Sequence, residues 1–256
     1  LPALIIADLL GVPGSERLQF QQWSDDLSDI VFSVEPGSLT VGDLKDATEQ
    51  FTSFFGGLLE HRRRHPGDDL ISIMANDSTD ELSTMELIGA CTLLLFAGHE
   101  TTTNLLTSAV RLFNEHPDQR QRLLDDPSVE HTAADELLRV VGPAKSMVRR
   151  VKVAHERGGH RFEVGDSVFL TMLVANRDPN TFPDPARLDV ARTPNPQLGF
   201  GWGSHLCLGA NLARLEATIA LGRLYRRFPA VVPDGELPAW RGNPLGRSIR
   251  EMPVVL

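Results

Sequence analysis

The feature that most constrains the fold is one long helical pattern over residues 83–115. Ser83 stands three residues before Glu86, the spacing of a capping box, and Pro117 follows the pattern at its far end. A helix of about 30 residues would be about 45 Å long, which is enough to cross a whole domain. Because the first half of the pattern is apolar on every side, we expect this helix to be buried.

The remaining patterns predict a mainly α protein with a small β subregion, in a single domain over residues 1–256. Short β-branched runs between glycines indicate the strands, and a segment without periodicity, 176–204, contains five prolines and predicts a functional loop. The predicted helices are 3–10, 15–32, 40–64, 70–75, 83–115, 127–141 and 208–228, and the predicted strands are 147–153, 161–164 and 168–173.

The charge balance and the cysteines exclude some classes of protein. With 25 Lys and Arg against 34 Asp and Glu, the net charge is −9, so the chain has no general excess of cations for binding nucleic-acid phosphates. The two cysteines, Cys91 and Cys207, lie far apart in unlike contexts, which argues against a disulfide framework and favours a reducing, cytoplasmic location. The longest apolar stretch, 87–98, is about 12 residues long and too short for a membrane span.

The most specific chemical signal is a cysteine in a glycine-rich loop directly before a predicted helix, in the segment FGWGSHLCLGANLARLE. Gly201, Gly203 and Gly209 let the backbone turn sharply and approach a flat ligand closely. The start of a helix favours negative charge, and so favours a thiolate at Cys207, which is the ligand that a haem iron needs for cleaving a bound O–O bond. From the residues alone, such a cysteine is either this ligand or a small apolar residue of the core.

The spacing of five residues favours the ligand. Phe200, Gly203, His205, Cys207 and Gly209 fill the pattern FxxGxHxCxG, which resembles the haem-binding signature of the cytochrome P-450 superfamily. The resemblance implies a cytochrome P-450 fold, heme b as the cofactor with dioxygen as co-substrate, and Cys207 as the axial ligand of the iron. It also implies a propionate-binding role for His205, and cofactor contacts from Phe200, Gly201, Leu208 and Gly209.

Residues 97–102, with the sequence AGHETT, resemble the oxygen-activation segment of the same family. Gly98 lacks a side chain in mid-helix, and we expect it, with Ala97, to leave space beside a flat cofactor. Glu100 and Thr101 supply an acid and a hydroxyl for proton transfer to bound dioxygen, which makes them the predicted catalytic residues. Taken alone, a solvated Glu-Thr pair on a helix surface would have the same sequence.

Glu136 and Arg139 match the ExxR pair of the family. At this spacing the two side chains share one face of a helix, although taken alone they would be an ordinary surface ion pair. The resemblance implies a structural role, in which the pair holds the loop ahead of Cys207. It also implies a propionate-binding arginine at Arg149, with the adjacent Arg150 as the alternative.

We therefore expect a haem-thiolate monooxygenase that hydroxylates an apolar small molecule. The family implies electrons from a ferredoxin- or flavodoxin-type donor with an NAD(P)H-dependent reductase. The basic residues at 62–64, 214, 223, 226 and 227 are either its docking face or ordinary solvated helix surface. The chain begins within the family pattern, so we expect a fold truncated at its N-terminus. Two alternatives stay open: a haem protein that does not oxygenate, and an inactive remnant of a longer enzyme.

Overall fold

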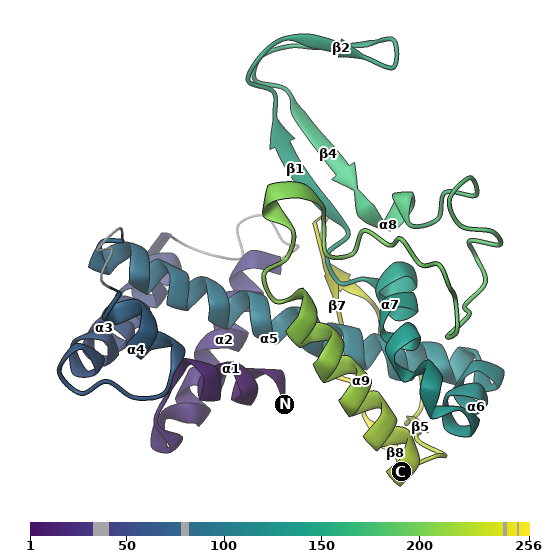
Figure 1. Ribbon diagram of the computed structural model, residues 1–256, viewed down its shortest axis with the longest axis horizontal. Helices are drawn as coiled ribbons and strands as arrows, with labels where there is room; N and C mark the ends of the chain where they lie inside the picture. Colours follow the sequence, from purple (N-terminus) through teal and green to yellow (C-terminus); the bar gives the residue numbers. More distant parts are fainter. Residues whose placement is uncertain (33–40, 78–81, 243–244, 250) are drawn as a thin grey trace. The chain divides into compact units, whose positions relative to one another are not determined.

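The computed structural model describes residues 1–32, 41–77, 82–242, 245–249 and 251–256. Its elements fall into two compact units, Leu1–Thr103 and Asn104–Leu256, and the division lies inside the long helix α5, Thr84–Glu115. Figure 1 labels the elements, and each unit is described by itself. The predicted fold class is confirmed, because the described residues are mainly helical and their sheets have two strands each.

The first unit consists of helices whose ends follow the breaker residues of the sequence. α1 ends at Gly11, whose left-handed φ of 71° is a conformation that glycine adopts without strain. Position 40, the predicted start of the third helix, lies outside the described residues. The bounds are α1 Pro2–Leu10, α2 Arg17–Phe32, α3 Val41–Arg64, α4 Leu70–Ala75 and the first part of α5, with a 3-10 turn η1 at Gly14–Glu16.

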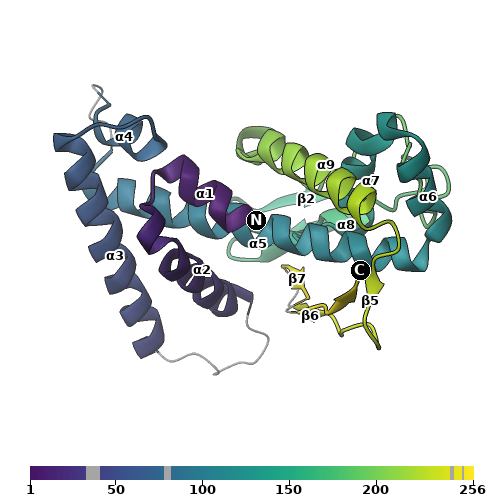
Figure 2. The same cartoon turned by 90° about the horizontal axis from the view of Figure 1, so that it is seen from below.

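Aromatic side chains join α2 to α3 in this unit. Phe20 and Trp23 of α2 contact Phe51, Phe54 and Phe55 of α3, with ring centroids between 5.0 and 6.3 Å apart. Figure 2 shows α1, α2 and α3 side by side. Because each aromatic pair buries a large apolar area in a preferred geometry, these contacts hold α2 against α3.

α5 begins with the predicted capping box. The Ser83 N–H donates to Glu86 Oε2 at 2.8 Å, and the Glu86 N–H donates back to Ser83 Oγ at 3.3 Å, so this prediction is confirmed. Leu87, Cys91 and Leu95 recur at helical spacing and are buried, whereas Met85 and Leu93 are exposed. This half of the helix is therefore buried on one side only, less than its all-round apolar pattern predicted.

The second unit contains a helix that the sequence analysis missed. α6, Pro117–Asp125, begins directly after α5. We took Pro117 only as the end of the preceding helix, but proline also suits the first position of a new helix, where no N–H is needed. The other bounds in this unit are α7 Glu130–Val141, α8 Met172–Ala175 and α9 Ala210–Arg227, with 3-10 turns η2 at Pro127–Val129 and η3 at Gly203–His205.

The core of this unit is built around α7 and α9. Leu137 of α7, Ala217 and Tyr225 of α9 and Phe113 of α5 are almost completely buried in one cluster of apolar residues. Phe113 and Tyr225 meet edge to face with ring centroids 5.3 Å apart. This cluster holds α9 through its middle and its C-terminal part, and the candidate site lies just before the start of the same helix.

The strands of the second unit form antiparallel pairs. β1 pairs with β4, and the β2–β3 hairpin extends from their far end in Figure 1. β2 was not predicted, and the predicted third strand ends earlier than expected because α8 begins at Met172. The bounds are β1 Ser146–Arg150, β2 His155–Arg157, β3 His160–Phe162, β4 Ser167–Thr171, β5 Val232–Pro233, β6 Arg241–Gly242, β7 Arg247–Ser248 and β8 Val254–Val255.

Within the described ranges, none of the helices combines the length and the apolar character that crossing a membrane requires.

Candidate functional site

The loop before α9 is folded tightly on itself. Gly201 and Gly203 have φ angles of +74° and +80°, which residues with a side chain rarely adopt. The Gly201 N–H donates to the Leu198 carbonyl at 2.8 Å, and the Cys207 N–H donates to the Phe200 carbonyl at 2.9 Å. These bonds close the loop and hold Cys207 just ahead of Ala210, the first residue of α9.

The two cysteines differ in accessibility, which ligand binding requires. Cys207 is exposed and carries a free thiol, whereas Cys91 of α5 is completely buried. Burial raises the pKa of the Cys91 thiol to about 12, so Cys91 stays protonated and unreactive. A Cβ atom at Gly209 would stand 4.0 Å from Cys207 Sγ, so the glycine keeps larger side chains away from the sulfur.

Phe200, which begins the loop, is supported by Arg214 of α9. The guanidinium of Arg214 lies over the Phe200 ring, 4.6 Å from its centroid, and its Nε donates to Asp135 Oδ1 at 2.9 Å. Gln197 Nε2 donates to the same carboxylate oxygen at 2.9 Å. Arg214 therefore acts as part of the support behind the loop.

Glu136 and Arg139 form a completely buried ion pair on α7, with contacts of 2.7 and 2.8 Å. Arg139 also donates to three backbone carbonyls of the segment 176–187, those of Asn176, Pro185 and Arg187, at 2.8–3.0 Å. A guanidinium carries five N–H donors in a rigid plane, so one side chain can hold several turns of an irregular segment at once.

The acidic partner, Glu136, binds the stretch of chain that follows this segment. Glu136 Oε1 accepts a hydrogen bond from the Asp189 N–H at 2.9 Å, and Glu136 Oε2 accepts one from Arg192 Nε at 3.1 Å. Because both charged groups are satisfied in this way, the pair can be buried without leaving an uncompensated charge.

Asn176 connects this network to the cysteine loop, a role that the sequence analysis missed. Its carbonyl accepts from Arg139, and its side-chain Oδ1 accepts from the Leu198 N–H at 2.7 Å. Leu198 in turn accepts the turn-forming bond from Gly201. The only sequence signal was a stretch, NRDP, that we took for general loop architecture.

The side chains of Arg149 and Arg150 lie on opposite faces of the strand β1. Met147 reaches the cysteine loop, since its Sδ and Cε atoms lie 3.8 Å from the Cβ position of Gly201. Side chains alternate along a strand, so Arg149 shares the face of Met147, and Arg150 lies on the opposite face. His205, on the 3-10 turn η3 in the loop itself, is exposed.

In the first unit, the segment 97–101 lies within α5. Thr101 Oγ1 donates to the Ala97 carbonyl at 2.7 Å, and both residues lie toward the exposed side of the helix. Glu100 is half-buried beside them. The space that we expected at Gly98 is taken by Ile6 of α1, since a Cβ atom there would stand 2.7 Å from Ile6 Cγ1. The glycine thus allows α1 and α5 to approach closely.

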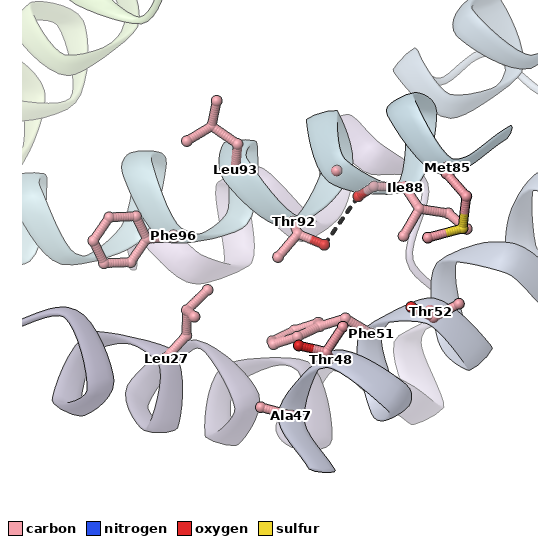
Figure 3. Close-up of a pocket in the computed structure, with 11 residues that line it drawn as sticks. Leu27, Ala47, Thr48, Phe51, Thr52, Met85, Ile88, Thr92, Leu93 and Phe96 are labelled. Atoms are coloured by element: carbon pink, nitrogen blue, oxygen red, sulfur yellow. Dashed lines mark hydrogen bonds between the residues drawn. The ribbon is translucent and has the colours of Figure 1, made fainter. Parts of the chain in front are cut away.

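A cavity of about 400 Å³ lies in the same unit between α2, α3 and α5 (Figure 3). Leu27 of α2 and Phe51 of α3 face α5 across it, and no charged side chain lines it among the described residues. The α5 wall is one stripe at helical spacing, made of Met85, Ile88, Gly89, Thr92, Leu93 and Phe96.

The arginines that we considered as a docking face are largely engaged already. Arg62 pairs with Asp69 at 2.8 Å, and Arg64 pairs with Glu60 at 2.6 Å. Arg226 pairs with Glu130. Such pairs reduce the charge that these residues offer to a partner.

A mainly α fold that presents an accessible cysteine on a braced glycine loop fits the class of thiolate-ligated haem proteins. The family model "Cytochrome P450" matches residues 131–246. The structure of CYP109E1 from Bacillus megaterium in complex with testosterone is 31% identical, with a TM-score of 0.89, over 99% of this chain and 69% of that one. The chain belongs to the cytochrome P450 family, as the sequence motifs predicted.

Two further similar proteins are a biotin biosynthesis cytochrome P450 and P450BioI in complex with an acyl carrier protein. The biotin biosynthesis cytochrome P450 of Bacillus subtilis (strain 168) is 37% identical over 99% of this chain. The structure of P450BioI with an acyl carrier protein carrying hexadec-9Z-enoic acid is 35% identical, with a TM-score of 0.89, over 100% of this chain. The chain spans 64% of the length of the biotin biosynthesis relative and 65% of the P450BioI chain.

The residues present fit the haem cofactor of this family. The donor is an exposed thiol, the ligand type that a P450 haem iron requires, and the glycine at position 209 leaves the sulfur uncrowded. The loop that carries the thiol is fixed by its own backbone bonds and by the buried ion pair behind it.

Proposed function

We propose that the chain carries the haem of a haem-thiolate monooxygenase, and that Cys207 Sγ would bind the iron of heme b. The observation that carries the proposal is the exposed Cys207 thiol on a loop braced from the buried Glu136–Arg139 pair through Asn176. When bound, the thiolate-ligated haem supplies the binding and cleavage of dioxygen. The overall reaction is R–H + O₂ + 2 e⁻ + 2 H⁺ → R–OH + H₂O.

We assign delivery of the two protons to Glu100 and Thr101. The Thr101 hydroxyl donates to the Ala97 carbonyl at 2.7 Å, which fixes its position. When its O–H turns away from this carbonyl, the hydroxyl can pass on its proton while it accepts another. Glu100, one residue earlier, is a carboxyl that can exchange protons with water because it is only half-buried.

We assign the haem propionates to Arg149 and His205. Arg149 is favoured over Arg150 because it shares the strand face of Met147, which reaches the cysteine loop. His205 lies in that loop, two residues before the ligand. Both side chains donate hydrogen bonds to carboxylates in their charged forms.

We propose that the substrate is an uncharged, mostly apolar molecule held in the cavity between α2, α3 and α5. Its walls offer apolar surface and threonine hydroxyls but no ionic partner, so a buried charge would lose its hydration without compensation. A volume of about 400 Å³ suits a compact small molecule. The related CYP109E1 has been solved with testosterone and corticosterone.

We propose a cytoplasmic location and a separate electron donor of the ferredoxin or flavodoxin type, with an NAD(P)H-dependent reductase. The support is the family itself, which generally uses redox partners. The two cysteines, one buried and one exposed, suit a reducing compartment.

The proposal is tested by the spectrum of the haem-loaded protein after reduction and addition of carbon monoxide. We expect the strongly red-shifted Soret band of thiolate ligation in the wild type and in the matched control Cys91→Ala, and its loss in Cys207→Ala. Thr101→Ala should keep the band but release more of the reducing electrons as hydrogen peroxide. If the red-shifted Soret band survived Cys207→Ala, Cys207 would be excluded as the ligand. If the protein bound haem but formed no product from testosterone or related probes, a non-oxygenating haem protein would be favoured.

A further inference from the structure

A hydrogen bond between two distant helices lies beside the proposed proton-delivery residues. Ser24 Oγ of α2 and His99 Nδ1 of α5 are 2.6 Å apart, and both side chains are buried. The neighbouring residues Phe20 and Trp23 of α2 pack against aromatic side chains of α3. A directional bond in an apolar interface fixes one register and one rotation, because breaking it leaves two buried polar atoms without water.

The position of His99 on α5 makes this bond relevant to Thr101. Two residues along an α-helix correspond to a rotation of about 200°, so His99 and Thr101 point to nearly opposite sides. The His99 side is fixed to α2 by the hydrogen bond, and Gly98 is fixed to α1 by close contact with Ile6. A turn that is held on its buried side by two helices presents its other side, with Thr101, in a defined direction.

The same bond is next to the proposed substrate cavity. Leu27, which lines the cavity from α2, follows Ser24 by three residues, about 4.5 Å along the helix. On α5, Phe96 lines the cavity three residues before His99. The Ser24–His99 bond therefore joins the two cavity walls at the end that leads to Glu100 and Thr101.

We propose that His99 is a positioning residue, whose bond to Ser24 sets the rotation of the α5 turn that carries Glu100 and Thr101. It thereby couples the α2 wall of the cavity to proton delivery. The inference rests on the proposed function for its consequence in turnover, but the positioning itself is a property of this unit of the chain.

The first test is amide hydrogen exchange in residues 97–103, measured by mass spectrometry on the protein without added substrate. His99→Phe keeps a ring of similar size but loses the nitrogen, and Ser24→Ala loses the hydroxyl. We expect each to speed exchange in this turn about tenfold, as for the loss of one buried hydrogen bond, and the double variant to exchange no faster than either.

Conservative variants separate positioning from a general loss of packing. An asparagine places its amide near the position of Nδ1, and a threonine keeps the hydroxyl, so His99→Asn and Ser24→Thr should exchange as slowly as the wild type. Ser108→Ala is the matched control, since Ser108 is a buried serine of the same helix whose hydroxyl donates within its own turn, to the Asn104 carbonyl. It should leave exchange at 97–103 unchanged.

The second test is turnover with testosterone as the probe. His99→Phe and Ser24→Ala should release several-fold more hydrogen peroxide per NAD(P)H oxidised, with an unchanged Soret band, and His99→Asn should restore coupling. Wild-type exchange and coupling in both His99→Phe and Ser24→Ala would overturn the proposal, and so would a failure of His99→Asn to rescue them. A missing thiolate Soret band would instead contradict the proposed function, while the exchange measurement would still decide the role of His99.

Discussion

Glu216 is an acidic side chain buried in α9. Its Oε2 atom has no hydrogen-bond partner among the described residues, and burial raises the pKa of the carboxyl above its ordinary value of 4.5. The folded protein therefore binds this proton more tightly than the unfolded chain does. Stability falls as the pH rises from 4.5 toward the higher pKa of the folded state, and above that pKa the full penalty applies.

Replacing this carboxyl with an amide should therefore stabilise the protein near neutral pH. We expect Glu216→Gln to raise the free energy of unfolding by about 1–2 kcal/mol at pH about 7, because burial of the ionisable carboxyl is penalised there and the amide stays neutral. The gain should shrink toward zero at low pH, where the wild-type carboxyl is protonated in both states. Urea unfolding at both pH values measures the difference.

Glu60→Gln is the control, since Glu60 is an exposed residue that pairs with Arg64 four residues later. Its stability should change by no more than about 0.5 kcal/mol. A loss of stability in Glu216→Gln near neutral pH would show instead that the charged carboxylate has a favourable partner.

Among the elements, α5 depends on a glycine for its packing. A side chain at Gly98 would overlap Ile6 of α1, whereas a Cβ atom at Gly89, in the same helix, would meet nothing within 4 Å. We expect Gly98→Ala to lower the free energy of unfolding by about 1–3 kcal/mol through overpacking, although alanine is the better helix former. Thermal unfolding of both variants measures this, with Gly89→Ala unchanged or more stable by up to about 1 kcal/mol.

A second variant identifies the cause of the loss. Truncating the opposing side chain in Ile6→Ala removes both atoms that the new Cβ would meet, so Gly98→Ala should cost less in that background than in the wild type. Equal costs in the two backgrounds would mean that Ile6 is not the obstacle.

The elements that the sequence predicted correctly are those with local signals. The capping box at Ser83 and Glu86 and the stop at Gly11 involve neighbours in the chain, so the sequence contains both partners of each contact. α6 was missed because Pro117 can end one helix or begin the next. The segment 176–204 shows no hydrophobic periodicity. Its backbone carbonyls are held by hydrogen bonds from Arg139, and every residue type has such a carbonyl, so the sequence does not reveal these contacts.

The candidate site also contains parts that a local sequence signal predicts and parts that depend on distant residues. Cys207 and its glycines are a local motif and could be found from the sequence, and the Glu136–Arg139 pair is one helical turn apart. The Ser24–His99 bond joins residues 75 positions apart, and nothing in either neighbourhood indicates the other. The contact between Gly98 and Ile6 was not predicted, because only the packing of α1 shows which side chain lies against this glycine.

For the whole molecule, haem binding and folding should be linked. A ligand that binds only the folded protein stabilises it, by about 2.7 kcal/mol at a concentration one hundred times its dissociation constant. For a chain of this size, this corresponds to a rise of about 5–10 °C in the melting temperature. We expect this rise when the haem-free protein is loaded with haem. The loop that carries Cys207 is held in place by Asn176 and the buried ion pair, so binding at Cys207 requires these contacts and favours the folded state.

Thermal unfolding with and without haem tests this linkage, with Cys91→Ala as the matched control that keeps the proposed ligand. The control should show the same rise as the wild type, whereas Cys207→Ala should show a smaller one, because binding without the thiolate is weaker. If the melting temperature of Cys207→Ala rose as much as that of the wild type on addition of haem, the added stability would come from adsorption to apolar surface rather than from ligation at this loop.

Arg139→Lys keeps the positive charge but lacks the rigid five-donor plane of the guanidinium, so it should lower the melting temperature of the haem-free protein and loosen the cysteine loop.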